Sequence, residues 1–161
     1  MAAFVSMRPA YYPVFFELAS RAYASENVLA GRWSAEEALE LSRAETERLL
    51  PQGLATPDHQ LLEILEAAQG PTVGFVWFTR LKRGSAYAAF VCQIYVVPEA
   101  RRRGHAKAAL AAVERMAQAQ GMASVALHVF AHNAGAQALY RSAGFAVASL
   151  NMHKPLPSSD A

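Results

Sequence analysis

Cysteine is nearly absent from this chain, because Cys92 is the only one among 161 residues. One cysteine permits neither an intramolecular disulfide nor a cysteine-based zinc site, and this agrees with a reducing compartment. Two further features are missing: a basic and apolar leader at the N-terminus, and the uncharged apolar run of roughly 18 to 20 residues that a membrane span requires. We therefore expect a cytoplasmic protein that uses no metal and has no membrane partner.

Acidic residues are scarce in the second half of the chain. Residues 1–66 carry ten acids and five arginines, a net charge of −5, whereas residues 67–161 carry three acids and ten basic residues, a net charge of +7. An excess of positive charge favours an anionic partner. Nucleic acid is not expected as that partner, because the arginines at 101–103 form one short loop without interleaved aromatic residues.

Apolar residues make up 53% of the chain, and no repeat or low-complexity linker divides it. This composition and length fit one globular domain, which we expect to span residues 1–154, followed by a flexible tail at 155–161. Hydrophobic periodicity and turn residues predict the order β-α-α-β-β-β-α-β-α-β, an α/β fold with a mixed sheet. Strands are expected at residues 4–8, 59–66, 72–80, 85–97, 124–130 and 145–152, and helices at residues 10–24, 35–50, 102–120 and, capped by Asn133, up to 143.

Local signals also predict how these elements connect. The three strands between residues 59 and 97 are separated by short turns and should form an antiparallel meander. Residues 85–130 form a strand–helix–strand unit, whose two strands should pair in parallel through a right-handed crossover. Ser34 and Glu37 have the spacing of a capping box, which predicts that the second helix begins directly after Ser34.

The most specific segment of the sequence lies where the strand Ile94-Tyr95-Val96-Val97 gives way to a helix. That helix opens with Arg101-Arg102-Arg103-Gly104-His105-Ala106-Lys107. Unpaired amides at a helix N-terminus bind anions, and the small residues Gly104 and Ala106 let a pyrophosphate approach the backbone closely. The spacing matches neither the P-loop nor the Rossmann glycine motif. The sequence therefore predicts a phosphate-binding loop of another kind.

This loop and a later segment together resemble the GCN5-related N-acetyltransferase (GNAT) family. The later segment is Leu127-His128-Val129-Phe130-Ala131-His132-Asn133, followed by Leu139-Tyr140 and Gly144-Phe145. The resemblance covers residues 91–145 closely. Residues 31–34 with 36–38, residues 49–51 and residues 128–133 look like a poorly characterised bacterial subgroup of the family. It implies a sheet that is splayed between the fourth and fifth strands. It also implies an enzyme that moves an acetyl group from acetyl-CoA to a primary amine by direct transfer in a ternary complex.

The resemblance assigns the acetyl-CoA contacts by position. The backbone of the fourth strand would pair with the pantetheine amides, the amides at the helix start would bind the pyrophosphate, and Asn133 would contact the cofactor. The residues expected to bind acetyl-CoA are Ile94, Tyr95, Val96, Arg101, Arg102, Arg103, Gly104, His105, Ala106, Lys107, Asn133 and Tyr140.

Tyr140 is the expected general acid. It follows Asn133 by seven residues, about two helical turns, and a phenol with an ordinary pKa near 10 has a proton to give to the departing thiolate. The resemblance assigns this role to the tyrosine. The alternative is an aromatic residue that only packs, with Asn133 serving only as a helix cap.

The general base departs from the family pattern. Many members carry a glutamate on the fourth strand, where this chain has Cys92 and Gln93, and another group carries one on the fifth strand, where this chain has His128. An imidazole with an ordinary pKa near 6.5 is suited to accept a proton at neutral pH, so His128 is the expected base. The alternatives are that His128 is a core residue and that a chain of water molecules releases the proton. Cys92 is not expected to act as a nucleophile, because its neighbours are apolar and no activating partner is evident.

The missing glutamate leaves a second function open: a catalytically weak acyl-CoA-binding sensor or interaction module. Tyr140 favours the enzyme, because binding alone needs no proton donor. The acceptor is expected to be an amine on a small molecule or on a polypeptide. An exposed final strand would also allow a homodimer.

Overall fold

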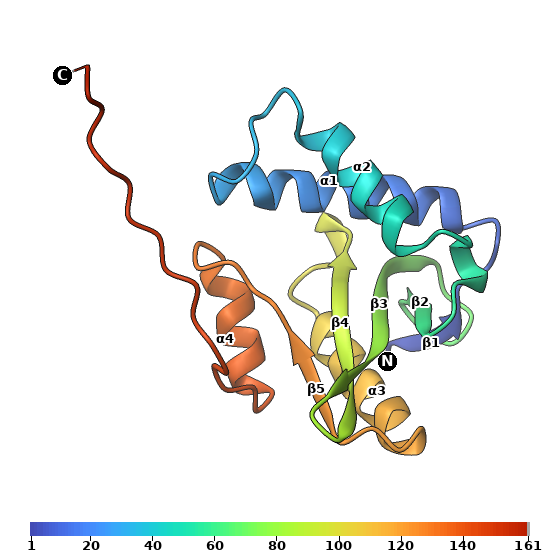
Figure 1. Cartoon of the computed structure of the whole chain (residues 1–161). Coiled ribbons are helices and arrows are strands. Elements are labelled where there is room, and N and C mark those ends of the chain that lie inside the picture. Colours follow the sequence, from blue (N-terminus) through green and yellow to red (C-terminus); the bar gives the residue numbers. More distant parts are fainter. Residues whose placement is uncertain (161) are drawn as a thin grey trace.

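The computed structural model describes residues 1–160 as a five-stranded mixed sheet with helices on both faces (Figure 1). Ala161, the last residue of the predicted tail, lies outside the described residues. The strands are β1 (Ala3–Ser6), β2 (His59–Leu65), β3 (Thr72–Arg83), β4 (Ala86–Val96) and β5 (Ser124–Leu127), and the helices are α1 (Tyr12–Leu29), α2 (Ala38–Leu49), α3 (His105–Ala119) and α4 (Ala134–Ser142). Two short 3-10 helices, Gly53–Ala55 and Pro98–Ala100, precede β2 and α3.

The strands lie in the order β1-β2-β3-β4-β5. Neighbouring strands from β1 to β4 are antiparallel, which confirms the predicted meander. Strands β4 and β5 pair in parallel, with α3 between them in the chain, and this confirms the predicted strand–helix–strand unit. The fold is therefore the α/β mixed-sheet fold that the sequence predicts.

Two apolar cores lie on opposite faces of the sheet. On one face, buried residues of β2, β3 and β4 pack against the apolar stripe of α3, which includes Ala109, Val113 and Ala117. On the other face, Phe15 of α1 makes edge-on contacts with Phe75 and Trp77 of β3, at ring-centroid distances of 4.8 and 5.8 Å. The sheet is thus held between α3 and the α1–α2 pair, and the chain beyond Leu127 forms a separate flank.

The start of α2 differs from the prediction. The capping box at Ser34 is wrong, because α2 begins at Ala38 after Glu37, and no side chain caps it. Residues 35–37 form a turn in which the Ser34 carbonyl accepts a hydrogen bond from the Ala38 amide at 3.1 Å. Tertiary contacts instead hold the helix, since the Ser42 hydroxyl donates to the Ser20 carbonyl of α1 at 2.7 Å. Packing on α1 therefore outweighs the local capping signal.

The predicted final strand at residues 145–152 is wrong. These residues form no ladder, and residues 146–160 make no backbone–backbone hydrogen bond within the part of the chain that the structure describes. The segment instead runs outward from the end of α4 in an extended form (Figure 1). A strand needs the free edge of a neighbour, and here a cavity separates the segment from β5. The apolar composition that suggests a strand is consequently left exposed.

Neither a membrane-spanning helix nor a cluster of metal ligands occurs in residues 1–160. No helix there is both long enough and apolar enough to cross a membrane. In the same residues, no three side chains of the His, Cys, Asp and Glu types gather into a group that could hold a metal ion.

Candidate active site

The sheet opens between β4 and β5 at a β-bulge. In the β3–β4 ladder Trp77 faces Gln93 and Phe78 faces Val91, so Cys92 is an extra residue on β4. A bulge of this kind bends its strand and increases the local twist. The bulge therefore turns the rest of β4 away from its next neighbour.

The pairing of β4 with β5 stops at the same place. The last ladder pair joins Val91 to Leu127, whereas β4 continues to Val96. Beyond the bulge, the edge of β4 that would face β5 carries backbone N–H and C=O groups without ladder partners. Three of the predicted cofactor residues, Ile94, Tyr95 and Val96, lie on this stretch of β4. Strand alternation turns the backbone groups of Ile94 and Val96 toward the free edge and those of Tyr95 toward β3.

The predicted phosphate loop leads from β4 into α3. Arg102 has a φ of +63° and Gly104 a φ of +83°, so the chain makes a left-handed turn and α3 begins at His105 rather than at residue 102. Gly104 is the N-cap and offers no side chain to the helix, so the first-turn amides have no side-chain cap. Such amides, at the positive end of the helix dipole, attract an anion.

The basic side chains of the loop point in different directions. Arg101 folds back on β4, where its Nε donates to the Val96 carbonyl at 2.8 Å and its guanidinium lies 5.6 Å from the centre of the Tyr95 ring. Arg103 pairs with Glu66 at 2.9 Å. Within residues 1–160, Arg101, Arg102 and Lys107 have no ion pair. Of these three, Arg101 is held against β4, so Arg102 and Lys107 are the cations left free to meet an anion.

His105 is the buried member of the loop. The residue is 7% exposed, and neither Nδ1 nor Nε2 of its ring has a hydrogen-bond partner among the described residues. A buried polar group without a partner is costly unless a water molecule or a ligand completes it. The orphaned ring beside uncapped helix amides therefore fits a loop that binds a polar group.

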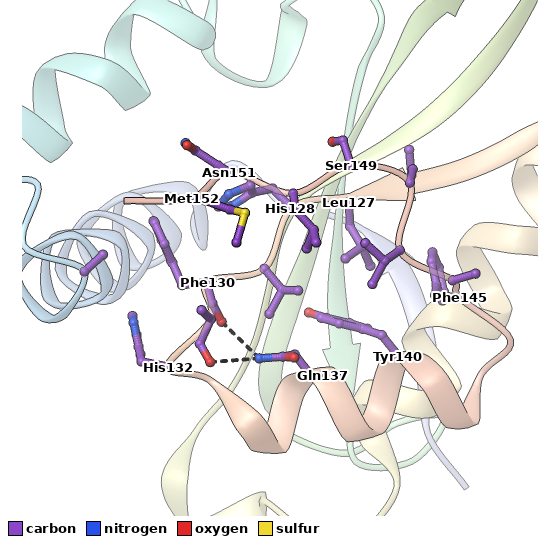
Figure 2. A pocket seen from close by; sticks show the side chains of 18 of the residues that line it. Leu127, His128, Phe130, His132, Gln137, Tyr140, Phe145, Ser149, Asn151 and Met152 are labelled. Atoms are coloured by element: carbon purple, nitrogen blue, oxygen red, sulfur yellow. Dashed lines mark hydrogen bonds between the residues drawn. The ribbon is translucent and has the colours of Figure 1, made fainter. Parts of the chain in front are cut away.

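A cavity of about 1080 Å³ lies beside β5 (Figure 2). It is bounded by residues 125–132, by one side of α4, by residues 29–32 at the end of α1 and by residues 145–153. Figure 2 shows the Tyr140 side chain reaching from α4 into this space, with His128 on the segment that follows β5. The structure thus brings the predicted acid and the predicted base to one cavity.

The environment of Tyr140 keeps its phenol protonated. Burial, together with the negative charge of Glu26, raises the pKa of Tyr140 above its ordinary value of 10. The hydroxyl makes no hydrogen bond to another described residue. A protonated phenol that points into a cavity is available to donate its proton there.

Asn133 and His128 are the other two predicted site residues near α4. Asn133 is confirmed as the helix N-cap, because its Oδ1 accepts from the Ala136 amide at 3.0 Å. His128 is exposed and its ring packs edge-on against Phe130, so the alternative of a core histidine is wrong. Its role as a base stays a prediction.

Cys92 is half-buried at the bulge. Burial raises the pKa of its thiol to about 12, and its Sγ lies 3.8 Å from the Phe90 carbonyl oxygen. A thiol with this pKa carries almost no thiolate at neutral pH, and the thiolate is the nucleophile. This environment agrees with the prediction that Cys92 forms no acyl intermediate.

One pair of residues at the site has no clear signal in the sequence. His132 Nε2 lies 2.7 Å from Glu26 Oε2, and this contact joins α1 to the loop before α4. Glu26 is one of ten acids in the first half of the sequence, and nothing local distinguishes it. The pair fixes the end of α1 over the cavity wall that also carries Tyr140.

Comparison with known proteins identifies the family. The profile of the acetyltransferase (GNAT) family matches residues 21–145. The chain belongs to this family, which uses acetyl-CoA, and it is an N-acetyltransferase by its fold and its relatives.

The relatives are themselves little characterised. The chain is 38% identical over 134 residues to the uncharacterized N-acetyltransferase YycN of Bacillus subtilis, covering 83% of this chain and 85% of YycN. It is 30% identical over 145 residues to the uncharacterized N-acetyltransferase YdgE of the same organism, covering 90% and 92%. A crystal structure of YycN superposes with a TM-score of 0.91 over 98% of this chain and 100% of that one.

A more distant structure shares only the fold. AAC(6')-Iy, solved in complex with the bisubstrate analogue CoA-S-monomethyl-acetylneamine, is 18% identical and has a TM-score of 0.61 over 98% of this chain and 99% of that one.

Proposed function

We propose that this protein transfers an acetyl group from acetyl-CoA directly to a primary amine while both substrates are bound. The observation that carries the proposal is at Leu127. This residue ends the β4–β5 ladder where the sheet opens, and it also lines the cavity that holds Tyr140. A thioester held along the free edge of β4 would therefore lie next to a proton donor.

The residues of the opening fit acetyl-CoA, which supplies an activated acetyl thioester when it is bound. The backbone groups of Ile94 and the Val96 amide, which face the open edge on either side of Tyr95, match the amides of an extended pantetheine arm. The uncapped amides of residues 104–107, with the uncompensated charges of Arg102 and Lys107, match a pyrophosphate. Asn133 keeps its side-chain NH₂ for a contact with the cofactor.

Proton transfer is assigned to two side chains. Tyr140 gives its proton to the departing thiolate, which its raised pKa favours because the phenol is protonated throughout the neutral range. His128, exposed in the same cavity, takes the proton of the attacking amine. A chain of water molecules through the open cavity is the alternative route for that second proton.

The protonated state of Cys92 supports direct transfer over an acyl-enzyme. We expect Cys92→Ala to retain turnover within about twofold, because the thiol with a pKa of about 12 takes no part in the reaction. No burst of CoA release that depends on Cys92 is expected in the wild type. Stopped-flow detection of CoA release in the wild type and the variant measures this. A burst of one equivalent of CoA that disappears with Cys92→Ala would contradict direct transfer.

The acceptor is an amine on a small molecule or on a polypeptide, and the cell compartment we propose is the cytoplasm. The bisubstrate analogue bound to AAC(6')-Iy joins CoA to the acceptor side. This supports a ternary complex for the present chain through the common fold alone. The alternative, an acyl-CoA sensor, would need neither a proton donor at Tyr140 nor a proton acceptor at His128.

The test is release of CoA from acetyl-CoA at pH 8 against polyamines, amino acids, aminoglycosides, and peptides with free lysine or N-terminal amines. We expect release with one class of amine and none with enzyme alone. Binding of acetyl-CoA without release for any class would favour the sensor.

The phosphate loop can be tested by comparing glycine-to-alanine variants at the two ends of α3. Gly104 and Gly121 both have positive φ angles, +83° and +74°, and a Cβ at either would meet no atom within 4 Å. Each Gly→Ala variant should lose about 1 kcal/mol of stability through backbone strain. Only Gly104→Ala should also weaken acetyl-CoA binding, by about threefold to tenfold, because it shifts amides of the loop. Equal dissociation constants for the two variants in calorimetry would contradict the assignment of the loop.

A further inference from the structure

The contact between Glu26 and His132 leaves one nitrogen of the imidazole unused. Glu26 Oε2 lies 2.7 Å from His132 Nε2, and because an ionised carboxylate only accepts hydrogen bonds, Nε2 carries its hydrogen. In the neutral ring Nδ1 then holds the lone pair, and no described residue donates a hydrogen bond to it. A carboxylate that fixes a histidine in this way also stabilises the imidazolium that forms when the other nitrogen takes a proton. The pair therefore has the groups that a proton acceptor needs.

His132 belongs to the wall of the cavity that holds Tyr140. His132 lines this cavity and Glu26 does not, so the carboxylate lies behind the ring and Nδ1 is the nitrogen left for a bound molecule. The His132 side chain is 29% exposed, so a proton taken here can pass on to solvent. Burial and, after it, the negative charge of Glu26 raise the pKa of Tyr140. The charge of this carboxylate therefore acts on the proton donor in the same cavity.

Glu26 is the source of negative charge at this cavity. Arg32, Arg83 and Arg141 line the space, together with three histidines, and no aspartate or glutamate of residues 1–160 lines it. Arginine side chains repel an ammonium ion, whereas a carboxylate attracts it. The Glu26 carboxylate acts on the cavity through the ring of His132, which lies in front of it. An ammonium group in this space is therefore placed most favourably beside His132.

Acetyl transfer to an alkyl amine releases two protons from nitrogen. An amine of the lysine type has an ordinary pKa of about 10.4, so it is an ammonium ion at neutral pH, and only the neutral form attacks a carbonyl. One proton must leave before the attack, and the second leaves once nitrogen has bonded to the acetyl carbon. His128 is assigned the second proton. The ring of Phe130 lies between His128 and His132, with its centre 4.9 and 5.5 Å from theirs, so the two imidazoles can serve separate steps (Figure 2).

We propose that His132, held by Glu26, takes the first of these protons, and that the acceptor is an alkyl amine that arrives as an ammonium ion. One N–H bond of the ammonium breaks, its electron pair stays on nitrogen, and the proton bonds to His132 Nδ1. The imidazolium pairs with Glu26 until it releases the proton to solvent. His132 is thus a catalytic residue, and Glu26 is a positioning residue that acts through it. This inference rests on the proposed acetyl transfer.

The pH dependence of Glu26→Gln tests this role. Relative to wild type at the same pH, kcat/KM for an alkyl amine should fall by about tenfold or more at pH 7 but by less than about threefold at pH 10, where much of the amine is already neutral. Glu17→Gln is the matched control, because Glu17 is also on α1 and in an ion pair, with Arg43 at 2.8 Å, and should behave like wild type. A loss that is equal at both pH values would show a structural role. A loss that grows with pH would show an effect on Tyr140 alone, and either result would overturn the inference.

Histidine ring signals in NMR spectra report ammonium binding without turnover. With CoA bound, n-propylammonium at pH 7 should shift the ring signals of His132, which a His132→Gln variant assigns. The shift should be lost in Glu26→Gln and kept in Glu17→Gln. This shift without CoA release from any amine would count against acetyl transfer and support the ammonium site. Absence of the shift in wild type, or an equal shift in Glu26→Gln, would overturn the inference whether or not CoA is released.

Discussion

Replacing Tyr140 with phenylalanine is expected to lower kcat by about a hundredfold or more, with the dissociation constant of acetyl-CoA unchanged within about twofold. The change removes one hydroxyl, which donates no hydrogen bond to another described residue, so the fold should be retained. The proton donor for the departing thiolate is lost, whereas the free edge of β4 and the phosphate loop are not altered. Steady-state kinetics and calorimetric titration with acetyl-CoA separate the two effects.

Tyr87→Phe is the matched control for this experiment. Tyr87 lies at the opposite end of β4 from the phosphate loop, is 40% exposed and packs beneath Arg80, so its hydroxyl has no part in the chemistry. Its replacement should leave kcat unchanged. An unchanged kcat in Tyr140→Phe as well would remove the acid role from Tyr140 and would favour protonation of the thiolate by water.

The raised pKa of Tyr140 adds a dependence on pH. The protonated phenol is the active form, so its contribution to kcat is lost as the pH rises through its pKa, which lies above the ordinary value of 10. In the profile of wild-type kcat against pH, ionisation of Tyr140 should therefore cause no loss below about pH 10. A loss near pH 8 that Tyr140→Phe abolishes would show that the phenol ionises much more readily than its surroundings imply.

Much of this site was predictable because its signals are local. The loop from Arg101 to Lys107 is recognisable from a strand, a small-residue turn and a helix start, all within about a dozen positions of the sequence. The cap at Asn133 is equally local. The ion pair of Arg103 was not predictable in this way, because its partner Glu66 lies 37 residues away in the sequence.

The features that sequence reasoning missed depend on distant pairs. Glu26 and His132 are 106 positions apart, and only the packing of α1 against the chain before α4 brings them within 2.7 Å. The segment at 145–152 has the composition of a strand, yet whether a strand forms depends on the edge available to it. Here the Gly144 amide donates to the Arg141 carbonyl and the Phe145 amide to the Tyr140 carbonyl, and after these bonds close α4 the segment lies across the cavity from β5.

A buried carboxylate on β2, beside the edge strand β1, gives the largest expected effect on stability. Glu63 of β2 is fully buried, and its Oε1 accepts from the Arg8 amide and from Arg8 Nε, both at 2.9 Å. Its Oε2 accepts from Arg8 Nη2 and from the Thr72 hydroxyl, both at 2.6 Å. The hydrogen bonds from Arg8 hold the pKa of Glu63 at about 2, well below its ordinary value of 4.5. The carboxylate thus ties the chain after β1 to the start of β3.

Glu63→Gln is expected to lower the free energy of unfolding at pH 7 by about 2 kcal/mol, a value reduced because Arg8 is largely exposed. A depressed pKa in the folded state contributes stability that is fully present above pH 4.5 and is lost as the pH falls toward 2. The difference between wild type and variant should therefore shrink over this range. Urea unfolding at several pH values measures it, with Glu45→Gln in the exposed Glu45–Arg48 pair as the control of small effect. A difference that is the same at pH 7 and pH 3 would mean that the shape of the side chain, and not its charge, stabilises this edge.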